Sequence, residues 1–165
     1  MSDNWNDGRE FERGQVFFVE LAGESRNVQR PSRLLLGAHR VVVLFSSTFP
    51  RNTVAVVPIS SLFEADGVTK KETFTSDVEL DAEEYKTAPS PYKGLIAHDS
   101  FIMTNQIRSV TRSRLERKVG QILPKDMLKL DIQLIDTLSL SDTVQSFIEA
   151  EVDRRFAEMG LVEEA

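Results

Sequence analysis

The sequence predicts an α+β fold, with short β-strands along most of the chain and helices in its last third. Two apolar runs rich in β-branched residues, 41–45 and 53–60, indicate neighbouring buried strands, because a polar segment containing Pro50 separates them. After Pro124 the apolar residues recur at helical spacing instead. We therefore expect a sheet followed by a helical C-terminal part.

The same signals place the other elements. Residues 14–21 are expected to form the first strand, because Gly14 begins an apolar run rich in β-branched and aromatic residues. Residues 62–71 are expected to be a turn-rich excursion, and 81–93, which contain two prolines, a loop. The further predictions are a strand at 73–80, a strand at 101–108, a short helical turn at 109–115 and a final strand at 119–123.

Two helices are expected at the C-terminal end. Pro124 suits the first turn of a helix, and Asp126 favours a helix N-terminus. Apolar residues then recur at helical spacing as far as Leu138. Ser141 is a good N-cap for a second helix, which Gly160 would end.

Length and composition limit what the chain can be. Its 165 residues suffice for one domain with a substantial core. A formal net charge of −6 argues against binding nucleic acid with the whole surface, so any such binding must be local. The chain has no cysteine and its two histidines lack the spacing of a metal pair, so we expect no metal and no cofactor. No apolar run approaches the roughly 20 residues that span a bilayer, so we expect a soluble, cytoplasmic protein without a membrane partner.

Basic residues gather in the β-rich part, whereas the helical end is acidic. The polar connection 22–39 contains Arg26, Arg30 and Arg33, and a second basic cluster lies within 108–118. Connections of this length are uncommon unless they are functional or disordered. Two interpretations of 22–39 stay open, a solvated loop or a flexible basic flap over an anionic ligand.

Arg40 and Ser60 stand where the apolar run of one strand begins and that of the next strand ends. Antiparallel pairing would bring them toward the same edge of the sheet, where a planar cationic donor and a hydroxyl suit a phosphate. A strand-edge salt bridge is the alternative for Arg40. His39 is a candidate general acid or base, and a surface histidine is the alternative.

Four segments resemble the PemK/MazF/Kid family of type II toxin–antitoxin endoribonucleases, and they follow the family's order along the chain. The segments and the family patterns that they resemble are 14–19 (Gly-Asp/Glu-Ile/Val-x-x-Val), 37–44 (Gly-x-x-Arg-Pro-x-x-Val/Ile), 56–61 (Val-x-Pro-Ile-Thr/Ser) and 99–110 (Ser-x-Ile/Val-x-x-Asp-Gln-Ile-Arg-Thr/Ser-Ile). The resemblance suggests three parts: a flexible leader at 1–13, a toxin domain at 14–138 and a helical extension at 139–165.

The resemblance implies an SH3-like small β-barrel with short helices, usually a homodimer, whose antitoxin partner covers an RNA groove. The family cleaves single-stranded RNA, including mRNA, without a metal. The 2′-hydroxyl attacks the adjacent phosphate and leaves a cyclic phosphate and a 5′-hydroxyl. Arg40 matches the family's catalytic arginine and Ser60 its catalytic Thr/Ser position, and His39 is a further candidate. The expected RNA contacts are Arg26, Arg30, Arg33, Ser61, Asn105, Gln106 and Arg108.

Two departures from the family pattern bear on activity. Val41 stands where the family usually has Pro, and Asn105 where many members have an Asp that some of them use for acid–base work. An amide cannot take up the proton, so this role would pass to His39 or another group, or be absent. Two alternatives to a nuclease therefore stay open: an inactive barrel that binds nucleic acid or protein, and a scaffold whose acidic helices assemble with another protein.

Overall fold

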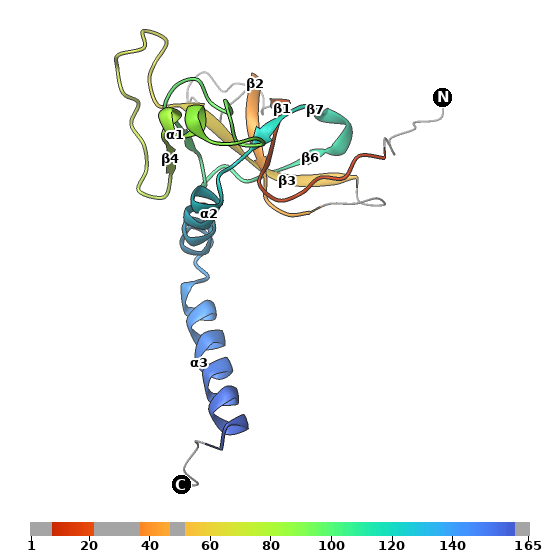
Figure 1. Cartoon of the computed structure of the whole chain (residues 1–165), viewed down its shortest axis with the longest axis vertical. Coiled ribbons are helices and arrows are strands. Elements are labelled where there is room, and N and C mark those ends of the chain that lie inside the picture. Colours follow the sequence, from red (N-terminus) through yellow and green to blue (C-terminus); the bar gives the residue numbers. More distant parts are fainter. Residues whose placement is uncertain (1–7, 22–36, 47–51, 161–165) are drawn as a thin grey trace, which may run out of the picture.

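The computed structural model describes residues 8–21, 37–46 and 52–160. Within these ranges the strands form one antiparallel sheet, and two long helices follow it (Figure 1). The strands are β1 (Gln15–Leu21), β2 (Gly37–Val43), β3 (Thr53–Ser61), β4 (Val78–Leu80), β5 (Ser100–Ile102), β6 (Arg108–Thr111) and β7 (Leu115–Gln121). The helices are α1 (Ala82–Thr87), the 3₁₀ helix η1 (Arg112–Arg114), α2 (Pro124–Thr137) and α3 (Ser141–Glu158).

The order of strands in the sheet is β4-β5-β3-β2-β1-β7, and β6 also pairs with β3. The α+β prediction is therefore confirmed, with the strands before the long helices. The pairings among the described residues leave β4 and β7 as the two ends of this order, so they do not close the sheet into a ring.

The apolar run of β2 is continuous because both of its faces are covered. Val42 pairs with Val16 of β1 and Val57 of β3, whereas the next residue, Val41, pairs with Phe17 and Pro58. Successive side chains of a strand point to opposite faces. Val41 and Val42 are nevertheless both fully buried, each in a different apolar cluster.

The central strand β3 changes its partner along its length, and Pro58 lies at the change. On the side away from β2, residues 53–56 pair with β6 and residues 59–61 pair with β5. Proline has no N–H to donate to a ladder and is disfavoured inside a sheet. Pro58 lies between the residues that pair with β6 and those that pair with β5, so no backbone N–H is needed there. Its carbonyl accepts a hydrogen bond from the Met103 N–H at 3.0 Å.

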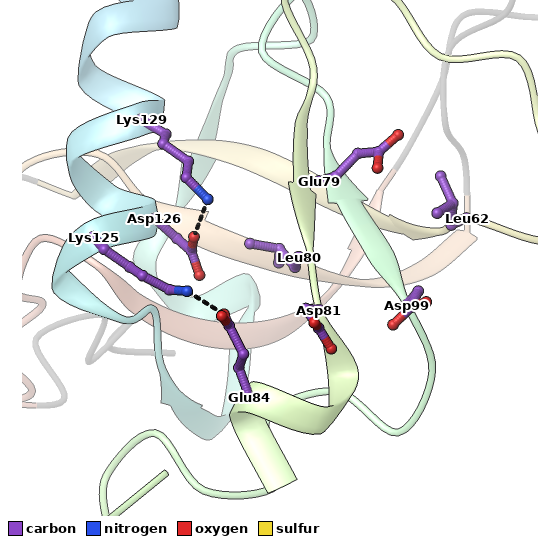
Figure 2. Close-up of a pocket in the computed structure, with 9 residues that line it drawn as sticks. All are labelled: Leu62, Glu79, Leu80, Asp81, Glu84, Asp99, Lys125, Asp126 and Lys129. Carbon is purple, nitrogen blue, oxygen red and sulfur yellow. Dashed lines mark hydrogen bonds and ion pairs between the residues drawn. The ribbon is translucent and has the colours of Figure 1, made fainter. Parts of the chain in front are cut away.

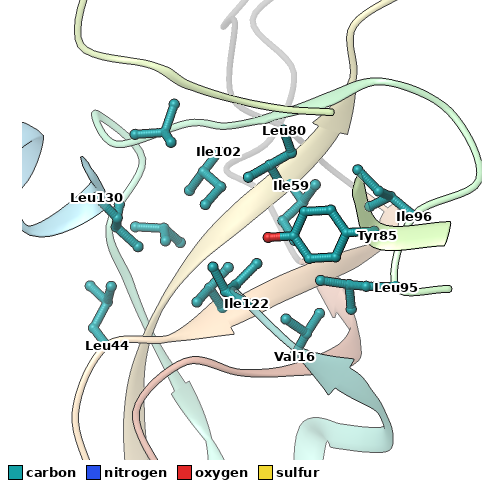
Figure 3. Packing of buried hydrophobic residues seen from close by; sticks show 13 residues of the cluster. Val16, Leu44, Ile59, Leu80, Tyr85, Leu95, Ile96, Ile102, Ile122 and Leu130 are labelled. Atoms are coloured by element: carbon teal, nitrogen blue, oxygen red, sulfur yellow. The ribbon is translucent and has the colours of Figure 1, made fainter. Parts of the chain in front are cut away.

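The larger apolar cluster lies between the sheet, α1 and the start of α2. Figure 3 shows the ring of Tyr85, from α1, among Leu95, Ile96 and Ile122. Tyr85 is fully buried. This cluster attaches α1 and α2 to the sheet.

The sequence prediction was wrong for two segments around β4. Only 78–80 of the predicted strand 73–80 are extended, because the Asp77 carboxylate accepts from the Phe74 N–H at 2.9 Å and forms a turn. The predicted loop 81–93 contains α1, which Asp81 begins by accepting from the Glu83 N–H.

The predicted strand at 101–108 is two short strands, β5 and β6, separated by a turn. The Gln106 N–H donates to the Met103 carbonyl at 3.0 Å, and the Thr104 hydroxyl donates to the Ser76 carbonyl at 2.7 Å. The turn lets β5 and β6 pair with different parts of β3. The predicted helical turn at 109–115 is only η1, because 109–111 belong to β6, and β7 begins at Leu115, before the predicted 119.

The C-terminal helices are confirmed, with one error at the start of α3. Pro124 occupies the first turn of α2, as predicted. The N-cap of α3 is Leu140 rather than Ser141, and no side chain caps it. The helix ends before Gly160, whose φ of 67° is in the left-handed region. Figure 1 shows α3 extending away from the sheet, and none of its residues is buried. Among the described residues, no helix is both long and apolar enough to cross a membrane.

Candidate RNA-binding site

Arg40 lies in β2, opposite Phe18 of β1 and Ile59 of β3. Its guanidinium carbon is 5.4 Å from the centre of the Phe18 ring, a cation–π contact. The side chain is half-buried, and among the described residues its Nε atom has no hydrogen-bond partner although it is buried. Within that part of the chain Arg40 also makes no ion pair, so the predicted alternative of a strand-edge salt bridge is not seen there. Its charge remains available for an anion.

Ser60 is buried near the end of β3 and has a cationic neighbour. Its Oγ accepts a hydrogen bond from Nζ of Lys71 at 3.2 Å and lies 3.4 Å from the Ser61 carbonyl oxygen, to which it can donate. Lys71 was not among the predicted site residues. The two adjacent lysines in the turn-rich segment 62–71 were the only hint of it in the sequence.

The predicted pairing of the two central strands is confirmed, but the two side chains do not meet. Arg40 is opposite Ile59, the residue before Ser60, so the backbones are adjacent at one end of the β2–β3 pair. Because side chains alternate along a strand, Arg40 belongs to the face of Ile59 and Ser60 to the other face. A single ligand oxygen is therefore not shared between them, and an extended ligand would have to cross this end of the strand pair.

His39 precedes Arg40 within β2 and pairs with Val19. It is half-buried, and residues 37–39 of the predicted loop 22–39 belong to β2, so His39 is part of the sheet. Alternation places it on the opposite face from Arg40.

The other expected RNA contacts among the described residues are either exposed or held by hydrogen bonds within the fold. Asn105 is exposed in the turn between β5 and β6. Gln106 is buried, and its Oε1 accepts from Nη2 of Arg108 at 3.2 Å. Partial burial lowers the pKa of Arg108 below its ordinary value. Ser61 is exposed, and its Oγ accepts from the Phe63 N–H. Arg26, Arg30 and Arg33 lie outside the described residues.

The second basic cluster contains residues with different roles. Arg112 is buried against Phe11, 4.7 Å from the ring centre, and donates to the backbone of Arg9. Arg114 donates to the Glu20 carbonyl. These arginines hold the chain around β7, whereas Arg117 reaches the ring of Phe18, which Arg40 also contacts.

A cavity of about 270 Å³ between β4, α1 and α2 has the opposite electrostatic character (Figure 2). Five carboxylates and two lysines line it: Glu79, Asp81, Glu84, Asp99, Asp126, Lys125 and Lys129. Lys125 pairs with Glu84 and Lys129 with Asp126, which leaves an excess of negative charge. Such a cavity repels phosphates, so the candidate RNA site is the face around Arg40.

A sequence model of the PemK-like, MazF-like toxins of type II toxin–antitoxin systems matches residues 12–138. No curated protein sequence matches the chain. Among solved structures, MazF from Deinococcus radiodurans superposes with a TM-score of 0.55 and 13% identity, covering 79% of this chain and 98% of that one. An endoribonuclease in complex with its cognate antitoxin, from Mycobacterial species, superposes with a TM-score of 0.50 and 18% identity, covering 79% of this chain and 96% of that one. A MazE–MazF structure from D. radiodurans superposes with a TM-score of 0.50 and 14% identity, covering 79% of this chain and 96% of that one.

The fold and the extent of the family match place the chain in one class of protein, the toxins of type II toxin–antitoxin systems. The chain belongs to the PemK-like, MazF-like toxin family, a family of endoribonuclease toxins. The match ends at Leu138, so α3 lies beyond the matched region.

Proposed function

We propose that the protein is an active toxin that cleaves single-stranded RNA without a metal, through a 2′,3′-cyclic phosphate. One observation carries the proposal. Arg40 matches the family's arginine, and it presents a half-buried guanidinium without an ion pair among the described residues. A fixed, unpaired donor of this kind stabilises the negative charge that builds up on phosphate oxygens in the transition state.

In the proposed reaction the 2′-hydroxyl of one nucleotide attacks the phosphorus atom that follows it. The bond to the 5′-oxygen of the next nucleotide breaks, that oxygen takes up a proton, and the 2′-oxygen has lost one. Arg40 binds the nonbridging oxygens during this exchange. Ser60 and Lys71, on the other face, orient the strand through a neighbouring phosphate. His39 lies on the opposite face of β2 from Arg40, and Asn105 cannot accept a proton, so neither of these two residues is assigned the proton transfer at this phosphate.

The experiment is to incubate the purified protein with a long single-stranded RNA in the presence of EDTA, and to map the fragment ends. The expected result is a set of discrete cuts that end in cyclic phosphate. A single 2′-deoxy nucleotide on the 5′ side of a mapped cut should abolish that cut, because the attacking hydroxyl is missing. Cuts that persist with the 2′-deoxy nucleotide would contradict the proposed chemistry.

An inactive RNA-binding protein is the second candidate, and the exposed amide of Asn105 favours it. In that case the same RNA would be bound in a salt-dependent manner but would stay intact. The scaffold alternative predicts no RNA binding even at low salt, where phosphate contacts are strongest.

We also propose that the protein forms a homodimer and is neutralised in the cytoplasm by a cognate antitoxin. Support comes from the family and from two related structures described as complexes, one with a cognate antitoxin and one of MazE with MazF. The mass of the purified protein in solution tests the dimer. Loss of the cleavage activity upon addition of the antitoxin tests the partner.

A further inference from the structure

Phe18 lies in the middle strand of a three-stranded part of the sheet, with an arginine reaching it from each neighbouring strand. Arg40 comes from β2 and is directly opposite Phe18. Arg117 comes from β7 on the other side of β1, where the next residue, Lys118, pairs with Phe17. The β1–β7 pairing shifts its register between Phe17 and Val19, so strict alternation does not apply to β7 here. The contacts with the Phe18 ring are what bring Arg40 and Arg117 together.

Both guanidinium groups lie within cation–π distance of the same ring. Their central carbons are 5.4 Å (Arg40) and 5.5 Å (Arg117) from the centre of the Phe18 ring. The two carbons can be no farther apart than the sum of these distances. Two like charges on one half-buried ring repel each other unless an anion lies between or beside them.

Acidic side chains do not compensate this pair within the described part of the chain. Glu20 and Glu116 are the acidic residues nearest to Phe18 and Arg117 in the sequence, and neither makes an ion pair with the two arginines there. The ring holds the guanidinium groups, which make no hydrogen bond with the described residues, so their accessible N–H groups can donate to a ligand. Two separate guanidinium groups suit two successive phosphates of a nucleic-acid strand better than they suit a single carboxylate.

We propose that Phe18 and Arg117 form a second phosphate subsite beside Arg40, which binds a phosphate of single-stranded RNA next to the one that is cleaved. This inference rests on the proposed function, because Arg40 defines the scissile phosphate. Arg117 is a positioning residue: it binds a group that does not change during the reaction. Its contribution is therefore the same in the ground state and in the transition state.

Binding to a single-stranded 2′-O-methyl RNA oligonucleotide, which cannot be cleaved, tests the subsite directly. Arg117→Gln should weaken binding roughly ten-fold, the effect of losing a hydrogen-bonded contact to a charged group. The slope of log affinity against log salt should fall by about 0.7, the value for one phosphate of a single strand. Lys118→Gln is the matched control: it removes the same charge from the adjacent exposed residue, and should have a clearly smaller effect on affinity.

The ring has its own test. Phe18→Leu keeps an apolar side chain but removes the surface that holds Arg117. In this background, Arg117→Gln should weaken binding much less than in the wild type, because the two residues act as one unit. Thermal unfolding of each variant checks that the fold is intact. In the cleavage reaction, Arg117→Gln should raise KM and leave kcat nearly unchanged.

The outcomes separate this subsite from the proposed nuclease. If the wild type binds but does not cleave, and Arg117→Gln alone weakens binding, the subsite stands and the nuclease proposal fails. If the wild type cleaves, and Arg117→Gln and Lys118→Gln weaken binding equally, only general positive charge is at work and the subsite is refuted. If the wild type does not bind the oligonucleotide at low salt, the subsite is refuted, whereas the nuclease proposal is decided by cleavage of unmodified RNA.

Discussion

The hydroxyl of Tyr85 joins α1 to α2, and removing it should destabilise the fold. It donates to Oδ2 of Asp126 at 2.9 Å and accepts from the Leu123 N–H at 3.1 Å. The Asp126 side chain is only 2% exposed, and its two oxygens accept hydrogen bonds from this hydroxyl and from Lys129. Tyr85→Phe keeps the ring in the core and removes only these two hydrogen bonds.

The expected loss of stability follows from these contacts. A hydrogen bond to a charged group contributes about 1.5–3 kcal/mol, and an ordinary one about 1 kcal/mol. Tyr85→Phe should therefore lower the free energy of unfolding by about 2–4 kcal/mol. For a chain of this size, this corresponds to a fall in Tm of about 5–15 °C.

Urea unfolding followed by circular dichroism measures this loss, and the m-value should be unchanged. Tyr92→Phe is the control: Tyr92 is half-buried, and its hydroxyl makes no hydrogen bond with the described residues. A loss below about 0.5 kcal/mol for Tyr85→Phe would show instead that Asp126 is satisfied without the hydroxyl.

The same residue predicts a pH dependence. Burial, followed by the nearby Asp126 carboxylate, raises the pKa of Tyr85 above its ordinary value of 10.0. Above this pH the unfolded chain releases the proton while the folded protein still holds it. Stability that is fully present below pH 10 is therefore lost as the pH rises further. The alkaline decline in stability should be shallower in Tyr85→Phe than in the wild type, as unfolding at a series of pH values will show.

Three further substitutions test local features by the same urea unfolding. Asp81→Ala removes the N-cap of α1 and should cost about 1 kcal/mol, whereas an unchanged stability would mean that the cap is dispensable. Gly120→Ala places a Cβ 3.1 Å from the Pro91 carbonyl oxygen and should cost about 1–3 kcal/mol, and a stabilised variant would contradict this close packing. Phe147→Ala, in α3, should change stability by less than about 0.5 kcal/mol because the side chain is 72% exposed, and a larger loss would show that α3 packs on the body.

The sequence predicted the fold best where a local pattern is long. The two apolar runs that became β2 and β3, and the helical periodicity of α2 and α3, are visible without tertiary information. The helix α1 was missed because its six residues depend on the Asp81 cap and on the burial of Tyr85 against Asp126. That contact joins residues far apart in the chain, so no local pattern contains it.

The candidate site was predictable only where a local sequence motif marks it. The position of Arg40 and Ser60 on adjacent strands followed from motif and pairing. Their placement on opposite faces depends on the register of β2 with β3, which a slip of one residue would reverse. The contact of Arg117 with Phe18 depends on the pairing of β1 with β7, and that of Lys71 with Ser60 on a folded excursion.

In the proposed function, Arg40 stabilises the transition state of RNA cleavage. The most direct measurement is the single-turnover rate at one mapped cut, with EDTA present, for the wild type and Arg40→Ala side by side, with thermal unfolding as the check of folding. The rate should be lower by about 10²–10³ in the variant, the usual effect of losing one preorganised donor. An intact variant that cleaves at the wild-type rate would contradict this role.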